Sequence, residues 1–449
     1  MMVTKPSFWH RPVPIAPLVT FRIVFGLLMF VSLLRFWWRG WISTVYTQPP
    51  FHFTYWGFEW VQPLQGAGMY ILFALIVLSC LLIAVGLFYR LAAIVFFLGF
   101  TYIELIDVTT YLNHYYFISL VAFIMIWLPA NRDYALDVRR KPAIARQWVP
   151  AWTIGILQFQ LAVVYVFAGI AKLNADWLLQ AEPMKTWLPA RSHLPIVGPL
   201  MYKEWMAYIF SWFGAVYDCF IVFFLMNRRS RPYAYAVVFV FHIATAIFFP
   251  GIGLFPYVMI VATLIFFSSR FHEQLLALLP FYRTRIVPEQ DRQLVFPYNK
   301  AVTLALGIYI ICQLVIPVRF LFYPDHLFWS EEGYRFSWRV MLMEKAGAAY
   351  FTLKDSSGIR HSTIDNATFL TPLQEKMMST QPDLILKYAH HLRDVYATKG
   401  WYKPQVYAEV YVSLNGQRSR LFIDSTVDLG SQALSWRHYN WILPYNSKP

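Results

Sequence analysis

A lysine at the end of an apolar segment is the residue of this chain best suited to acid–base chemistry. Lys172 follows roughly twenty mostly apolar residues and stands in the string AGIAKLNADW at residues 168–177. A lysine at a membrane edge usually extends its ammonium to the headgroups, which is a structural role. Asp176, four residues on, could hold it there as a helical ion pair. Desolvation favours the uncharged amine, so at the rim of a closed cavity Lys172 could instead act as a base. Both roles remain open.

Other ionisable side chains also fall in or beside apolar segments. His114 opens one segment next to Asn113, and His242 lies inside another. Such groups are costly within a membrane and are therefore candidate functional residues. Structural alternatives exist for each: an interfacial aromatic belt around His114 and a helix–helix hydrogen bond for His242. Asp218 and Arg22 are predicted to form a buried structural pair rather than a proton relay.

The helix face that carries Lys172 combines small and polar residues. At 100° per residue, Tyr165 and Gln158 lie within about 40° of Lys172, and Ala168 and Gly169 within about 60°. Small residues let two helix backbones approach closely. We therefore expect this face to pack in a helix bundle around a polar ligand rather than to face lipid.

Composition predicts a polytopic α-helical membrane protein. Of 449 residues, 58% are hydrophobic and 14% charged, whereas soluble proteins carry about 25% charged residues. Apolar runs long enough to span a bilayer, or nearly so, predict about nine transmembrane helices. They lie near residues 17–38, 69–89, 91–107, 115–130, 151–171, 205–226, 233–250, 252–268 and 301–317.

Charge distribution predicts the orientation of these helices. With the N-terminus in the cytoplasm, the inner segments carry sixteen Lys and Arg residues and the outer connections five. Cytoplasmic loops carry such an excess, so the net charge of +14 reflects topology and no nucleic-acid partner is expected. Nine spans then place the C-terminal region in the periplasm or lumen. We expect a membrane domain at 1–318 and an outer domain at 319–449.

The outer region has the pattern of a small α+β domain. Strands are predicted at 334–343, 348–353 and 359–364, and a helical segment at 371–398 interrupted near Pro382. Asn415-Gly416, a pair typical of tight hairpin turns, separates further strands at 406–414 and 418–423.

Several kinds of chemistry lack their sequence signatures. No HExxH, glycine-rich phosphate loop, GxSxG or CxxC motif occurs, and all three cysteines lie in apolar runs, so no metal site is predicted. A membrane transport or binding protein remains an alternative. Against it stand the absence of an internal repeat and the large outer domain.

Taken together, the motifs resemble the vitamin K-dependent γ-glutamyl carboxylase family and its bacterial relatives. The resemblance covers most of the chain and includes both predicted domains. It is carried by FRIVFG at 21–26, NHYY at 113–116, AGIAKLNADW at 168–177, FH at 241–242, GYRFSW at 333–338 and VSLN at 412–415. The family's lysine pair reads Ala171-Lys172 here, which keeps the second lysine and loses the first.

The resemblance implies that Lys172 deprotonates reduced vitamin K, whose reaction with O₂ yields a strongly basic alkoxide and finally the epoxide. That base removes a γ-proton from a glutamate of a protein or peptide substrate, and CO₂ adds to the carbanion. His114 with Asn113 would stabilise the oxyanion of the quinol, and His242 would be a second active-site histidine. Quinol oxidation or epoxidation without carboxylation is the alternative within enzymes.

The same resemblance implies residues that bind the glutamate substrate. Arg191 is the candidate cation for the glutamate carboxylate. Trp329, Tyr334 and Trp338 match aromatic positions of the family's substrate-binding outer domain.

Overall fold

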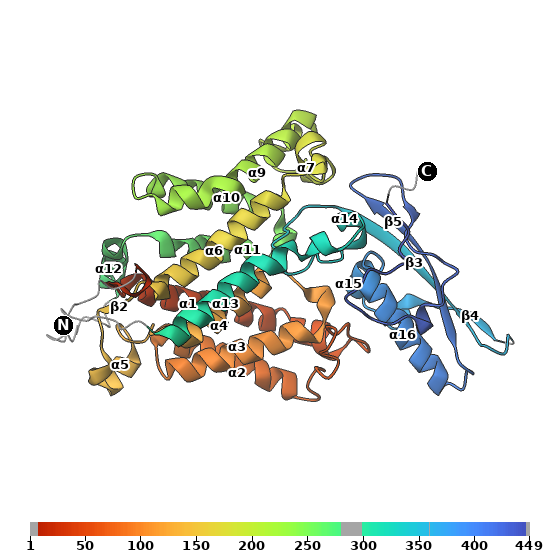
Figure 1. The fold of residues 1–449 in the computed structure, drawn as a ribbon, viewed down its shortest axis with the longest axis horizontal. Coiled ribbons are helices and arrows are strands. Elements are labelled where there is room, and N and C mark those ends of the chain that lie inside the picture. The colour runs from red at the N-terminus through yellow and green to blue at the C-terminus, as the bar shows by residue number, and fades with distance from the viewer. Residues whose placement is uncertain (1–7, 280–298, 359, 446–449) are drawn as a thin grey trace.

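The chain forms a bundle of apolar helices with an α+β domain at one end (Figure 1). This computed structural model describes residues 8–279, 299–358 and 360–445. Short strands β1 (Pro12–Pro14) and β2 (Trp148–Pro150) pair antiparallel at the end of the bundle opposite the α+β domain. The N-terminal elements and the C-terminal domain therefore lie at opposite ends of the bundle.

Among the described residues, seven helices are long and apolar enough to cross a membrane. They are α1 (Ala16–Trp38), α2 (Gly68–Val85), α3 (Tyr89–Ile106), α6 (Trp152–Ala171), α9 (Glu204–Met226), α10 (Arg231–Phe248) and α13 (Lys300–Val315), which continues as the 3₁₀ segment η11 (Ile316–Phe322). An eighth span is possible where α11 (Phe255–Thr263) continues through η8 (Leu264–Phe266) and bends by 115° into α12 (Ser269–Ala277). The shorter α4 (Asn113–Trp127) is also apolar.

The prediction of a polytopic helical membrane protein is confirmed. All nine predicted apolar runs fall in these helices, but membrane-length helices number seven, or eight with the bent pair, among the described residues. The difference arises because the run at 115–130 forms a helix of only 15 residues and the run at 252–268 is broken. Shorter helices are α5 (Leu136–Arg140), α7 (Ala175–Leu179), α8 (Met184–Trp187) and α14 (Leu327–Ser330).

Close packing of α6 against α9 depends on a glycine. A Cβ atom at Gly169 would lie 2.6 Å from the backbone nitrogen of Cys219, which is closer than real side chains approach. The predicted small face of α6 is therefore in contact with another helix, as expected. In Figure 1, α6 runs between α9 and α10 on one side and α1 to α4 on the other.

The outer domain consists of a four-stranded antiparallel sheet covered by two helices. The strand order is β4-β3-β5-β6, with β3 (Lys345–Lys354), β4 (His361–Thr363), β5 (Gln405–Leu414) and β6 (Arg420–Leu421). Helices α15 (Pro372–Met378) and α16 (Pro382–Thr398) supply the remaining layer. Asn415 and Gly416 both have positive φ, as the predicted tight turn requires. Ile359, the first residue of one predicted strand, lies outside the described residues.

The prediction of a strand at 334–343 is wrong, because residues 334–338 form turns and the rest of the segment is irregular. Phe336, Trp338 and Met341 have positive φ values, which a β-strand does not accommodate. The aromatic rings of Phe336 and Trp338 pack against Tyr116 of α4. Alternating apolar residues here serve contacts with the helix bundle rather than with a sheet.

Hydrogen bonds attach the outer domain to the bundle. Three of 2.7–2.8 Å join Gln374 to Asp107, Asn415 to Asp176, and Asn113 to the backbone carbonyl of Arg339. The bundle ends that carry Asn113 and Asp176 are therefore held against the outer domain.

Candidate active site

An apolar cavity of about 470 Å³ lies between α6, α9, α10 and α11. Val340 and Met341, from the turn segment 334–343, contribute to its lining. The outer domain thus helps to enclose a space formed mainly by membrane helices. Polar side chains in the lining include Tyr165, Lys172, Asp218 and Thr245.

Lys172 points into this cavity from the C-terminal end of α6. It is 6% exposed, and its Nζ donates hydrogen bonds to Asp218 Oδ2 at 2.7 Å and to the carbonyl of Ala168 at 3.3 Å. Nζ also lies 5.3 Å from the ring centroid of Trp177, within range of a cation–π interaction. The side chain is therefore held inside the bundle and does not extend to the headgroups.

Neither ion pair considered from the sequence forms among the described residues. Asp176 accepts a hydrogen bond from Asn415, and Lys172 pairs with Asp218 instead. Arg22 donates to the backbone carbonyl of Tyr134 rather than to Asp218. The carboxylate that faces Lys172 therefore comes from α9 and not from the segment following α6.

The partner of Asp218 was predicted wrongly because the sequence does not show how far α9 extends past the end of α6. The N-terminal half of α9 continues beyond the end of α6, where the indole of Trp177 donates to the carbonyl of Ser211 at 2.7 Å. Mid-helix Asp218 consequently lies level with Lys172. One signal was available: Asp218 is the only acidic residue of α9 after Glu204.

The two predicted histidines lie behind one wall of the cavity. His242 Nε2 is 3.3 Å from the hydroxyl of Tyr165, and its ring centroid is 5.5 Å from that of Phe255. The ring centroid of His114 lies 6.1 Å from that of Phe255. Phe255 and Tyr165 both line the cavity. Among the described residues, buried His114 Nε2 and His242 Nδ1 have no hydrogen-bond partner.

The side chains of Asn113 and Arg191 donate hydrogen bonds to backbone carbonyls near the cavity. Asn113 donates to the carbonyl of Arg339, next to the lining residue Val340. Arg191 Nε donates at 2.7 Å to the carbonyl of Phe248, which precedes the lining residue Phe249. Asn113 thus secures the segment that helps to enclose the cavity, and Arg191 lies close to its edge.

None of the three aromatic residues predicted to bind substrate is among the described residues that line the cavity. Trp329 is buried in the outer domain, and its indole donates to the carbonyl of Leu443. Trp338 stacks on Tyr116 at 5.0 Å. The ring of Tyr334 contacts that of Phe328 within the outer domain.

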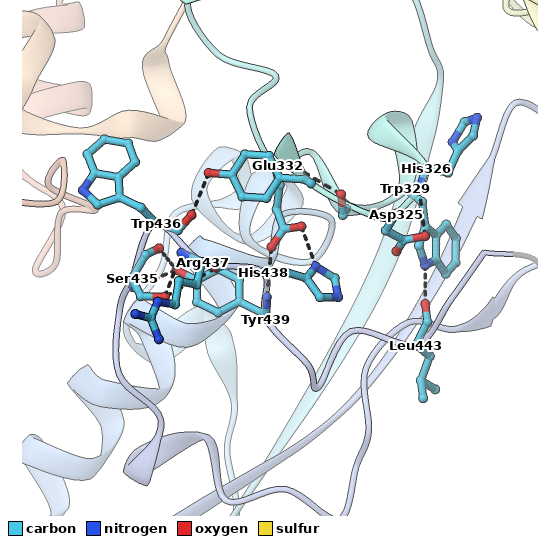
Figure 2. A network of polar contacts seen from close by, with 12 residues as sticks. Asp325, His326, Trp329, Glu332, Ser435, Trp436, Arg437, His438, Tyr439 and Leu443 are labelled. Atoms are coloured by element: carbon cyan, nitrogen blue, oxygen red, sulfur yellow. Dashed lines mark hydrogen bonds and ion pairs between the residues drawn. The ribbon is translucent and has the colours of Figure 1, made fainter. Parts of the chain in front are cut away.

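A second cavity, of about 330 Å³, lies between the outer domain and the connection that follows α1. Each acidic residue in its lining has a basic partner: Glu331 with Lys345, Glu332 with His438 and Asp383 with Arg335. Figure 2 shows Glu332 also accepting from the backbone of Tyr439. Burial raises the pKa of Glu332, while the contact with His438 opposes this shift. The contacts of Glu332 attach the C-terminal segment to the rest of the outer domain, and Lys172 does not line this second cavity among the described residues.

Fold and cavity together define a polytopic membrane protein whose extramembrane domain helps to enclose a buried, apolar site. A model of the HTTM domain matches residues 10–271, and a model of the lumenal domain of vitamin K-dependent gamma-carboxylase matches residues 298–448. The chain therefore belongs to the vitamin K-dependent gamma-carboxylase family. Membership indicates a carboxylase-like enzyme with an extracytoplasmic C-terminal domain. No solved structure matches the chain significantly.

Proposed function

We propose that this chain couples the epoxidation of reduced vitamin K to the γ-carboxylation of glutamate in a protein or peptide. The single observation that carries this proposal is the buried Lys172 amine in the apolar cavity between the helices. A volume of about 470 Å³ is within the usual range of small-molecule sites.

The cavity suits a lipid-soluble quinol. Its walls include Phe213 of α9 and Val240 of α10, which are also 51% and 66% exposed on the apolar surface of the bundle. An apolar substrate can therefore approach through the bilayer between these helices. Behind the wall of this cavity, His114 Nε2 and His242 Nδ1 are buried without a hydrogen-bond partner among the described residues. Oxidation of the quinol by O₂ would supply the strong base that glutamate carboxylation with CO₂ requires.

The contacts of the surrounding residues support a role for each. Lys172 takes a hydroxyl proton of the quinol. His114, which lies behind Phe255 of the cavity wall, stabilises the negative charge that this transfer leaves, and Asn113 holds the enclosing segment. His242 orients the hydroxyl of Tyr165.

Recognition of the glutamate substrate is assigned to residues nearer the outer domain. Arg191, fixed at the cavity edge, attracts the carboxylate of the substrate glutamate. Trp329, Tyr334 and Trp338 support substrate binding through the structure of the outer domain rather than through the cavity lining.

The proposed orientation places the N-terminus in the cytoplasm. Residues 1–318 then form the membrane domain and residues 319–449 the extracytoplasmic domain, at the end of the bundle opposite β1 and β2. The excess of Lys and Arg in the alternate connections supports this arrangement.

Reconstituted protein tests the proposal. With reduced vitamin K, O₂, isotopically labelled bicarbonate and a glutamate peptide, wild type should form epoxide and labelled γ-carboxyglutamate, whereas Lys172→Ala should form neither. Lys185→Ala is the matched control, because Lys185 pairs with Glu204 near the bundle surface and does not line the cavity among the described residues. Epoxide without γ-carboxyglutamate would identify a quinol epoxidase. No epoxide from wild type would refute the enzymatic proposal.

A further inference from the structure

The contact between Lys172 and Asp218 raises a chemical question about the proposed base. As whole residues they are 6% and 7% exposed, and Nζ of Lys172 lies 2.7 Å from Oδ2 of Asp218. As an ion pair, Lys172 is an ammonium and has no lone pair with which to accept a proton. The carboxylate of Asp218 is then the basic group of the pair.

The surroundings supply no competing charge among the described residues that line the cavity. Titratable side chains near the pair are Tyr165 of α6, Tyr217 and Cys219 of α9, and His242 of α10. Burying two charges in an apolar space is costly, so an uncharged amine and acid compete with the ion pair. The two forms differ only in the position of one proton along an existing hydrogen bond.

We propose that Asp218 accepts a proton from the Lys172 ammonium and so frees the amine to take a proton from the quinol. This inference rests on the proposed function. An N–H bond of Lys172 breaks as an O–H bond forms on Asp218, which frees the lone pair of Nζ. Nζ then takes the hydroxyl proton of the quinol, so the O–H bond breaks and an N–H bond forms.

Total charge is conserved in this sequence. Lys172 ends as an ammonium, Asp218 as a neutral acid, and the negative charge has moved from Asp218 to the quinol oxygen. The ammonium then lies beside that new charge and stabilises it. Asp218 acts through Lys172 and is therefore a positioning residue that also stores the proton.

Substitution of Asp218 separates this relay from a lysine acting alone. In Asp218→Asn, desolvation would favour an uncharged Lys172, and a lysine acting alone would remain a competent base. A relay would lose its proton acceptor, and epoxide formation should fall by at least about 100-fold, the lower limit typical of general acid–base catalysis. Asp218→Glu keeps the carboxylate and should recover part of the rate.

Infrared spectroscopy tests the proton position without turnover. Protein labelled with ¹³C-aspartate is mixed with reduced vitamin K in the absence of O₂, which stops the reaction before oxidation. We expect a carboxylate band to be replaced by an isotope-shifted carboxylic-acid C=O band. The band should be absent from Asp218→Asn and unchanged in Asp424→Asn, a control in an outer-domain turn.

Each outcome decides one of the two proposals. If wild type forms epoxide but shows no carboxylic-acid band, the relay is wrong and the proposed function stands. The same holds if Asp218→Asn forms epoxide at the wild-type rate. Wild type that forms no epoxide refutes the proposed function. If Asp218→Asn does not fold, the wild-type band and the pH profile of Asp218→Glu still decide, because a purely structural role would shift neither.

Discussion

Replacing the Lys172–Asp218 pair by apolar residues should cost less stability than removing either partner. Both side chains are almost fully buried, at 8% and 10% exposed, and are joined at 2.7 Å. Removing one partner of a buried pair leaves an unmatched charge and costs about 3–5 kcal/mol. We therefore expect Lys172→Met and Asp218→Leu each to lower the free energy of unfolding by about this amount.

The double variant removes both charges and keeps apolar volume in the cavity wall. Apolar replacements of buried pairs are often neutral or stabilising, so its free energy of unfolding should lie within about 1 kcal/mol of wild type. Single losses of about 3 kcal/mol or more and a double loss of at most about 1 kcal/mol give a coupling of at least about 5 kcal/mol between the two positions.

Reversible unfolding in mixed detergent micelles measures these free energies. Lys185→Met serves as the control, because its pair with Glu204 is partly exposed and should contribute at most about 1 kcal/mol. Additive effects of the two single substitutions would refute the reasoning, since they would mean that Lys172 and Asp218 do not neutralise each other in the folded protein.

Three further predictions concern packing, domain attachment and pH. Gly169→Ala should destabilise the bundle by about 1–3 kcal/mol, because the new methyl group would lie 2.6 Å from the backbone of α9. Gly307→Ala is the control, because no atom lies within 4 Å of a Cβ at that position. Equal free energies of unfolding for the two variants would contradict this packing. Asn415→Gly keeps a turn-compatible residue but removes the hydrogen bond to α7, so hydrogen exchange should quicken in α7; unchanged exchange would exclude that attachment. Burial alone would raise the pKa of Asp383, but Arg335 outweighs it and holds the pKa below its usual value. The pair therefore stabilises the fold above the ordinary pKa of aspartate, about 3.9. This stabilisation is lost as the pH falls through the lower pKa that Asp383 has in the folded protein. The difference in melting temperature between wild type and Asp383→Asn should therefore vanish at acid pH, and a difference that persists there would refute the prediction.

The class of protein and much of its local structure were predictable from the amino-acid sequence. Long apolar runs must be helices in a bilayer because only helices satisfy their own backbone hydrogen bonds there. The hairpin at Asn415-Gly416 was predictable because its turn needs residues that tolerate positive φ. Lys172 was identifiable as a candidate because an ionisable group in an apolar setting is rare.

The tertiary structure decided which groups meet. Helical periodicity describes the face of one helix but not its axial offset from a neighbour. The sequence therefore offered Asp176 as a candidate partner of Lys172 and did not reveal Asp218. The segment 334–343 looked like a strand because alternation does not reveal whether apolar residues face a sheet or a helix bundle. The close approach of α6 and α9 at Gly169 sets the offset that turns two isolated charges into one buried pair.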